Sequence, residues 1–269
     1  VPAQNMVSRG MGGISTGFID SIGFLSYSQS INLTNPAALG SLNTTLFDVG
    51  GEIDMRTLKS NSSLEKYTAT NTLISYLQLG FPVTPKRMLA KHNAWGISFG
   101  LRPATRINYK IQGESKQTGV DSITTLYEGN GGVNQANFST GIRIKNFSFG
   151  ISTGYTFGNR ETGTKIGFLT DSARYMQSNT AATSRFGGGF LTAGVQYAMR
   201  LKNKSVLRIG LSGTAEQKLK GKGNKLNETF AFAEDGSIRN IDTLSACTDQ
   251  KGTVVFPGAS GTGFTYTFT

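Results

Sequence analysis

The sequence is poor in the side chains that most catalytic and metal sites need. It contains one cysteine, Cys247, and one histidine, His92, in 269 residues. One cysteine cannot form an intrachain disulfide, and a Ser-His-Asp triad, a Cys-His pair or a histidine-based zinc site would all have to use the same histidine. His92 lies between Lys91 and Asn93 in an expected turn, where a solvated side chain is the simpler interpretation. We therefore expect no enzyme activity, no metal and no cofactor.

Long apolar runs and dense charge are also missing. No apolar run approaches the ~18–20 residues that a membrane-spanning helix requires. Charged residues make up 16% of the chain, which is below the roughly 25% of an average soluble domain. Aromatic residues make up 10% and glycine is abundant, with 35 residues, a composition that argues against disorder. No Walker sequence occurs, and the glycines that precede Ser15 do not complete a dinucleotide-binding fingerprint.

The positive charge is spread along the chain. Lys and Arg total 27 against 16 Asp and Glu, which gives a net charge of +11. Nucleic-acid-binding proteins usually gather their basic residues on one stripe, so we expect no nucleic-acid partner. The densest group, Lys218, Lys220, Lys222 and Lys225 among glycines, predicts a mobile loop. Outer-membrane lipid or lipopolysaccharide is a better match for diffuse positive charge.

Alternation of apolar and polar residues is the strongest pattern in the chain. From Phe47 to Met55 the odd positions are apolar or glycine, whereas Asp48, Glu52 and Asp54 occupy even positions. Similar alternation recurs over residues 95–102, 106–112, 137–145, 147–158, 191–200 and 207–212. A period of two predicts β-strands that have one apolar and one polar face.

A soluble β-sandwich also alternates, but three features favour a membrane barrel. The polar face is mostly Gly, Ser, Thr and Asn, whereas the outward face of a sandwich is usually charged. Aromatic residues lie near the ends of the apolar stripes, as in an interfacial girdle. Segments of ~10–14 residues exceed the usual soluble strand and match a tilted membrane-crossing strand of ~9–11.

The connections give a further indication. Polar loops are expected at residues 59–70, 113–134, 159–187 and 221–252, alternating with shorter links at 84–93, 145–146 and 201–204. Long outer loops and short periplasmic turns are typical of outer-membrane barrels. The fold class predicted is therefore all-β, a transmembrane outer-membrane β-barrel of about eight strands. The start Val1-Pro2-Ala3-Gln4 looks like the end of a secretory signal, which places the protein in the cell outer membrane of a Gram-negative bacterium.

The N-terminal region resembles the FadL-type family of outer-membrane transport proteins. The similarity rests on the stretches Val7–Gly13 and Ser21–Tyr27, and on Asn35-Pro36-Ala37 before the first strand. A second similarity is Val254-Val255-Phe256-Pro257, which looks like the family's entry into a mid-barrel strand. The resemblance implies uptake of hydrophobic compounds such as long-chain fatty acids, with Asn35, Pro36 and Ala37 as the plug motif.

The resemblance also implies a division of the chain. Residues 1–44 would be an N-terminal hatch or plug, and residues 45–269 an antiparallel transmembrane barrel. The family barrel has fourteen strands, and an eight-stranded barrel is filled by its own side chains, so we expect the barrel to be incomplete at the C-terminus. The alternative is that the N-terminal segment is a flexible arm outside the barrel.

Two main functions follow, together with a plain diffusion pore that an apolar plug argues against. The first is passive uptake of a hydrophobic ligand, with Arg102, Arg106 and Lys110 on one strand face to attract a carboxylate head group. These cations could instead pair with the carboxylates of Asp48, Glu52 and Asp54 across the lumen. The second function is that of a non-transporting barrel subunit of an outer-membrane secretion or assembly complex, in contact with other subunits.

Overall fold

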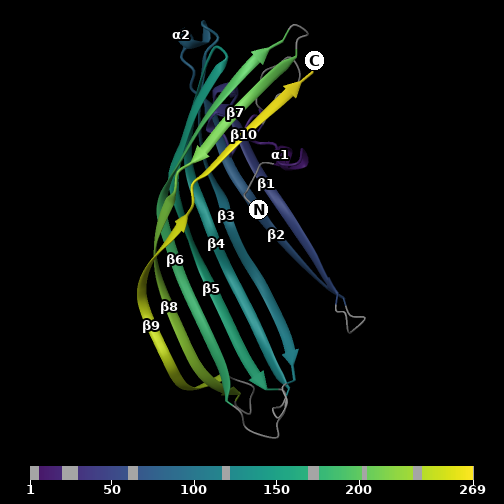
Figure 1. Ribbon diagram of the computed structural model, residues 1–269, viewed down its shortest axis with the longest axis vertical. Helices are drawn as coiled ribbons and strands as arrows, with labels where there is room; N and C mark the ends of the chain where they lie inside the picture. Colours follow the sequence, from purple (N-terminus) through teal and green to yellow (C-terminus); the bar gives the residue numbers. More distant parts are fainter. Residues whose placement is uncertain are drawn as a thin grey trace.

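The protein is described by a computed structural model over residues 6–19, 30–59, 66–116, 122–168, 176–201, 205–232 and 238–268. Most of these residues lie in strands (Figure 1). The short helices are α1 (Met6–Gly10), η1 (Pro36–Ser41) and α2 (Lys86–Leu89). The strands are β1 (Leu46–Lys59), β2 (Lys66–Pro82), β3 (Ala94–Ser115), β4 (Ile123–Ile144), β5 (Phe147–Phe168), β6 (Gln177–Arg200), β7 (Val206–Thr214), β8 (Gln217–Phe232), β9 (Ile238–Phe256) and β10 (Ala259–Thr267). None of the helices in the described ranges is long and apolar enough to cross a membrane.

All of these strands belong to one antiparallel sheet, which curls into a half-barrel (Figure 1). The strands follow the order β1-β2-β3-β4-β5-β6-β7-β10, and β8 and β9 continue the sheet beside the first half of β6. Only Ala215 and Glu216 separate β7 from β8, and only Pro257 and Gly258 separate β9 from β10. The described residues therefore form eight long strands, two of them interrupted, in agreement with the predicted number. The predicted signal remnant and the Ser21–Tyr27 stretch lie outside the described residues.

The outer face of the sheet is apolar and exposed. On β5 the odd-numbered side chains Phe147, Ile151 and Tyr155 are about half exposed, whereas Ser148 and Thr156 on the opposite face are buried. Neighbouring strands continue this apolar belt at the same level, with Phe99, Leu101, Phe138, Leu191, Ile209, Leu211 and Phe264 exposed. So large a contiguous apolar surface is rare on a soluble monomer.

The long loops predicted from the sequence are wrong. Residues 113–134, 159–187 and 221–252 are in large part strand, because β3, β4 and β5 each run for 22 residues and β6 for 24. The Lys218–Lys225 stretch predicted as a mobile loop is part of β8. The strand segments that were predicted as loops contain many Gly, Thr, Asn and Lys residues and lack an apolar stripe. They are therefore held in strand conformation by backbone pairing rather than by burial of one face.

A line of irregularities crosses the sheet where the apolar belt ends. The pairing register shifts between Gly50 and Gly51 and between Pro103 and Thr105. At the corresponding level of β4, Gly131 and Gly132 have φ of 124° and 147°, which favours glycine. The interruption between β7 and β8 lies nearer the turn end, because Ala215 donates to the Leu191 carbonyl, whereas Gly131 and Gly132 are level with Ser184 and Arg185 of β6. The sheet thus divides into a belt half and an extended half.

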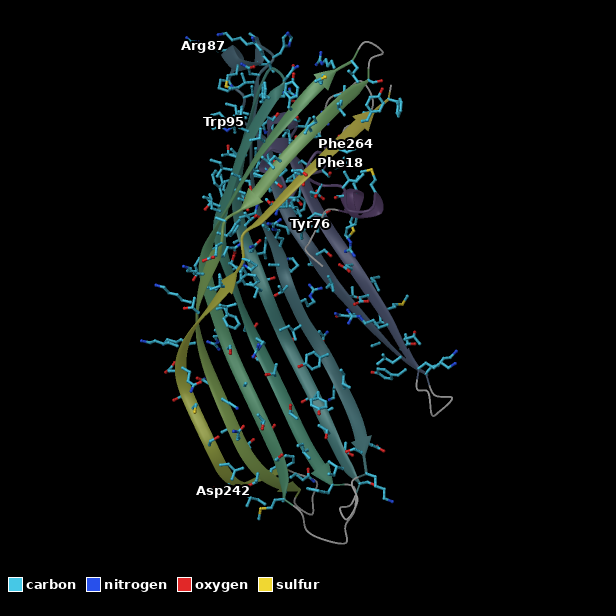
Figure 2. All side chains as sticks on the ribbon, in the orientation of Figure 1. Phe18, Tyr76, Arg87, Trp95, Asp242 and Phe264 are labelled. Carbon is cyan, nitrogen blue, oxygen red and sulfur yellow. The ribbon has the colours of Figure 1, made fainter. Side chains whose placement is uncertain are left out.

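The tight turn predicted at Lys145-Asn146 is confirmed, because these two residues alone connect β4 to β5. Most of the turn predicted at 201–204 lies outside the described residues. The link at 84–93 contains α2 and the exposed His92, which lies in a turn as expected. Figure 2 shows Arg87 of α2 at this turn end and Asp242 of β9 at the opposite end of the molecule.

Candidate functional site

The candidate site is the contact between the N-terminal segment and the inner face of the sheet. Four glycines, Gly96, Gly141, Gly150 and Gly194, are direct partners of one another across β3, β4, β5 and β6. We call this row the glycine track. Because glycine has no side chain, the track leaves a shallow depression in which another backbone can lie against the sheet.

Helix η1 fills that depression. All six of its residues are buried, and the helix contacts β3, β4, β5 and β6. A Cβ added at Gly141 would lie 2.5 Å from the Pro36 carbonyl oxygen, and one at Gly150 would overlap the Pro36–Ala37 peptide. These separations are far below the ~3.5–4.0 Å of ordinary carbon contacts. The backbone of η1 is therefore packed directly on the glycine track.

Asn35 fixes the start of η1 and is completely buried. Its side-chain oxygen accepts a hydrogen bond from the backbone N–H of Ala37 at 3.1 Å, which is the bond expected of a helix N-cap. Its side-chain nitrogen donates to the Thr16 carbonyl at 2.7 Å. Pro36 follows as the first helical residue, where its missing N–H costs nothing. The predicted motif thus lies where the segment contacts the sheet most closely.

The first half of the N-terminal segment contacts the other side of the half-barrel. The Thr265 hydroxyl on β10 donates to the Gly17 carbonyl at 3.0 Å, and the Gln196 amide donates to the Thr16 carbonyl at 3.0 Å. A Cβ added at Gly17 would lie 2.7 Å from the Gly263 carbonyl oxygen of β10, so the two backbones are in direct contact. This part of the segment is therefore bound to β6 and to β10, the latter at one edge of the sheet.

An ion pair holds α1 to β1. The Arg9 guanidinium donates two hydrogen bonds to the Glu52 carboxylate, at 2.8 and 3.2 Å. The bonded carboxylate raises the pKa of the Arg9 side chain above its ordinary value. Both side chains are about one-third exposed, so the pair is partly screened by water.

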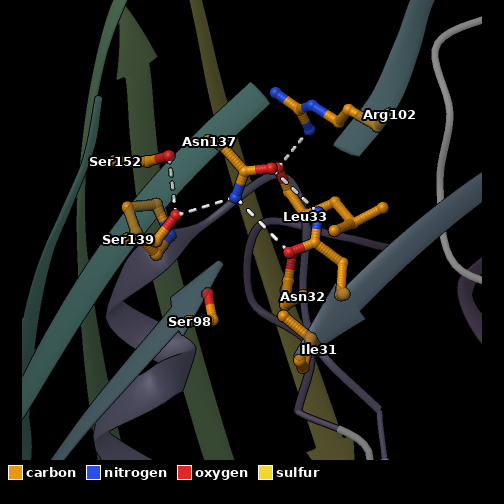
Figure 3. Close-up of a pocket in the computed structure, with 10 residues that line it drawn as sticks. Ile31, Asn32, Leu33, Ser98, Arg102, Asn137, Ser139 and Ser152 are labelled. Carbon is orange, nitrogen blue, oxygen red and sulfur yellow. Dashed lines mark hydrogen bonds between the residues drawn. The ribbon is translucent and has the colours of Figure 1, made fainter. Parts of the chain in front are cut away.

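Arg102 lies on the inner face and contacts the N-terminal segment. Its guanidinium donates to the Leu33 carbonyl and, at 3.2 Å, to the side-chain oxygen of Gln135. Figure 3 shows Arg102 above Asn137, Ser139 and Ser152, which line a small polar pocket. Ser139 donates to Ser152 at 2.7 Å, and Asn137 donates to Ser139 at 3.2 Å. This pocket has room for about one water molecule.

The predicted ligand-binding cations do not lie on one face. Lys110 pairs with Glu128 at 3.0 Å, and Glu128 also binds Lys165 of β5 at 3.3 Å. Lys165 occupies an odd position on β5 and therefore lies on the outer face. Arg106 shares the face of Lys110 because no register shift separates them. The irregularity after Pro103 therefore separates Arg106 and Lys110 from the inward Arg102, which alternation alone could not predict.

Among the described residues, the ladder of ion pairs considered from the sequence does not form. The pKa of Glu52 is lowered chiefly by the hydrogen bond from Arg9 and, to a smaller extent, by the charge of Arg106. Glu52 binds Arg9, and Asp54 pairs with Arg56 at 2.6 Å. Asp48 accepts hydrogen bonds from the Tyr76 hydroxyl at 3.0 Å and from the Ile31 N–H at 3.1 Å. Two of the three carboxylates thus hold the N-terminal segment to β1.

Comparison with known families gives a match that covers residues 3–268 and is described as BamG. The chain belongs to the BamG family. This finding corrects the FadL-type assignment, since the BamG match spans nearly the whole chain whereas the resemblance rested on short motifs around Asn35 and Pro257. No curated protein and no solved structure matches this BamG chain significantly.

Asn35, Pro36 and Ala37 of this BamG-family chain were predicted from the sequence, whereas the glycine track and Asn32 were not. Asn32 accepts from the N–H groups of Thr34 and Asn35 and donates to the Phe18 carbonyl at 2.9 Å, so it joins the two halves of the segment. Glycines at every fourth position, with serine or threonine midway between them, were visible over residues 96–100 and 150–158. Their alignment across strands depends on register, which the sequence does not show.

Proposed function

We propose that this protein is a non-transporting subunit of an outer-membrane assembly complex. Its sheet forms part of a transmembrane β-barrel, residues 1–44 act as a fixed plug, and its partners are other subunits of the complex. The match of residues 3–268 to BamG is the observation that carries this proposal, because the family name refers to that type of complex. The location that follows is the outer membrane of a Gram-negative bacterium.

The apolar belt supports insertion of the sheet into a membrane. On β5 the belt runs from Phe147 to Phe157, which matches the ~9–11 residues of a tilted membrane-crossing strand. Trp95, Phe147 and Tyr197 lie near the turn end of the belt, where interfacial aromatic residues occur in barrels. The extended half would then project from the membrane.

The packing of the N-terminal segment favours a fixed plug over a moving one. Release of η1 would expose the buried Asn35 side chain and six buried residues. It would also break the hydrogen bonds that the Asn35 amide donates to the carbonyls of Val195 on β6 and Leu211 on β7, both at 3.4 Å. We assign Arg102 to this packing, because its guanidinium binds the Leu33 carbonyl. Its role in binding a ligand stays a prediction. A fixed plug suits a scaffold that presents its extended half to partners.

The direct test is purification of the tagged full-length protein from native envelopes in mild detergent. We expect other outer-membrane assembly subunits to remain bound in stable amounts, since a scaffold subunit acts through such contacts. Recovery of the protein alone from envelopes in which the assembly machinery is intact would contradict the proposal. A tagged barrel of unrelated function from the same envelopes serves as the control.

A disulfide that locks the plug tests whether it must move. A Cβ added at Gly261 would lie 3.2 Å from the Thr16 hydroxyl oxygen, so Thr16→Cys with Gly261→Cys places two thiols within bridging reach. Cys247→Ser removes the exposed native thiol. We expect oxidised cells that carry this variant to assemble their outer-membrane barrels at the wild-type level. Loss of assembly that a reductant restores would show that the plug moves, and the Cys247→Ser protein alone is the control.

A further inference from the structure

A group of basic residues lies on the outer face of the sheet directly beyond the apolar belt. Arg185 of β6 is the cross-strand partner of Lys222 of β8, and Lys222 is the partner of Lys251 of β9. The three side chains form one lateral row of like charge, and each of them is exposed. Lys218 and Lys220 lie on the same face of β8, which lengthens the row toward the belt.

The position of this basic row relative to the belt is fixed by the strand register. Lys220 is opposite Gly187, and Gly187 is opposite Phe157, the last exposed aromatic residue of the belt on β5. Arg185 and Lys222 follow two residues farther along, which is about 7 Å of strand. The basic row therefore begins where the apolar surface ends, at the depth of lipid head groups in a membrane-inserted sheet.

Tyr155 marks the same boundary. Its side chain is about half exposed, and its hydroxyl lies over Gly187, at the place where a side chain would otherwise stand. Tyrosine is enriched at the membrane–water interface because its ring is apolar and its hydroxyl polar. A phenol hydroxyl beside Lys220 supplies a further hydrogen-bonding group at the edge of the belt.

The charge of the row is only partly balanced within the described residues. Lys218 pairs with Glu216 at 3.4 Å, and Lys222 pairs with Asp249 at 3.5 Å, both in exposed positions where such pairs contribute little. No described carboxylate forms an ion pair with Arg185, Lys220 or Lys251. Like charges directly opposite each other destabilise a sheet, so an external anion that bridges Arg185, Lys222 and Lys251 would relieve this repulsion.

We propose that this basic row binds the phosphate of a lipid head group, with the acyl chains of that lipid against the neighbouring apolar belt. The continuity of Phe157 and Leu191 with the row favours an amphipathic ligand over a free anion, because both parts of a lipid find a matching surface. Arginine and lysine are suited to phosphate oxygens through charge-assisted hydrogen bonds. This inference rests on the proposed insertion of the sheet into a membrane.

The test compares two triple variants of the full-length protein in detergent micelles by native mass spectrometry. The first variant carries Arg185→Gln, Lys222→Gln and Lys251→Gln. The control carries Lys86→Gln, Arg87→Gln and Lys91→Gln, which removes the same charge from exposed residues at the turn end. The probe is phosphatidylglycerol, with the uncharged lipid diacylglycerol as reference.

We expect the first variant to lose at least about fivefold in phosphatidylglycerol binding, since each cation near a lipid phosphate contributes about 1 kcal/mol. The control variant should stay within about twofold of wild type, and binding of diacylglycerol should not change in either protein. Equal losses in both variants, or no loss in the first, would overturn the proposal, as would displacement of the lipid by inorganic phosphate alone.

Thermal unfolding verifies that both variants fold. Co-purification with assembly subunits is measured separately, so failure of the complex and failure of the lipid site are distinguishable.

Discussion

At the scale of single residues, the contact between η1 and the sheet depends on the absence of side chains. The glycine track is required on the sheet side, whereas Asn35 and Pro36 determine where the helix begins. The two requirements are linked, because a Cβ added at Gly194 would overlap the Asn35 side chain itself. A substitution in the track therefore acts on the plug as directly as a substitution in the motif.

Gly150→Ala tests this dependence. The added methyl group would collide with the backbone between Pro36 and Ala37, and because backbone cannot move aside as a flexible side chain can, we expect a loss of about 2 kcal/mol or more in unfolding free energy. Gly163→Ala on the same strand is the matched control, since nothing lies within 4 Å of its added Cβ. Denaturant unfolding in detergent measures both, and equal stability of the two variants would contradict the packing described here.

The sequence predicted some residues of this site and not others, for physical reasons. Asn35 and Pro36 were recognisable because capping is a local property of neighbouring residues. The contact of Arg102 with Leu33 joins residues 69 positions apart. The separation of Arg102 from Lys110 arises from a single irregularity after Pro103. One extra residue in a strand exchanges its two faces, so alternation read across such a position assigns side chains to the wrong side.

At the scale of the elements, the prediction of strands succeeded where one face is apolar and failed where neither is. The belt segments of β3, β4 and β5 were found because their alternation is strict. Apart from the alternating residues 106–112 of β3, the long strands of the extended half were assigned to loops, since Gly, Asn and Lys are depleted from average strands. Its order comes from pairing on both sides, as for β5 between β4 and β6.

The β4–β5 turn offers a prediction at this scale. Lys145 has a φ of 54°, in the left-handed region that disfavours residues with a Cβ. Its backbone N–H binds the Asn93 side chain at 3.1 Å, a bond that does not depend on the lysine side chain. We expect Lys145→Gly to stabilise the protein by about 0.5–1 kcal/mol, because removal of the strain exceeds the entropy that glycine adds to the unfolded chain. Lys145→Ala, which removes the charge but keeps the strain, is the control in thermal unfolding, and a gain for alanine equal to that for glycine would contradict this explanation.

At the scale of the whole molecule, the sheet has two edges that lack a strand partner among the described residues. One edge is β1, and the other is formed by β9 and β10. In a lipid environment every backbone N–H and C=O must be paired within protein, so the belt parts of both edges need a β-strand partner if the proposed insertion is correct. The glycine track and η1 lie between these edges and hold β3 to β6 against one backbone segment.

The β1–β2 hairpin should be the least stable part of the extended half. Pairing of β2 with β3 ends at Leu77 and Leu101, after which the hairpin diverges from the sheet (Figure 1). Residues 51–59 of β1 therefore have only β2 as a partner, whereas residues 123–133 of β4 are paired with β3 and β5. Segments with fewer packed neighbours open at lower free energy, so we expect backbone amides of residues 51–59 to exchange hydrogen about tenfold faster or more than those of residues 123–133. Residues 77–80 of β2, which pair with β1 and with β3, provide the internal reference. Equal protection of the hairpin and β4 would mean that another strand covers the hairpin in the assembled protein.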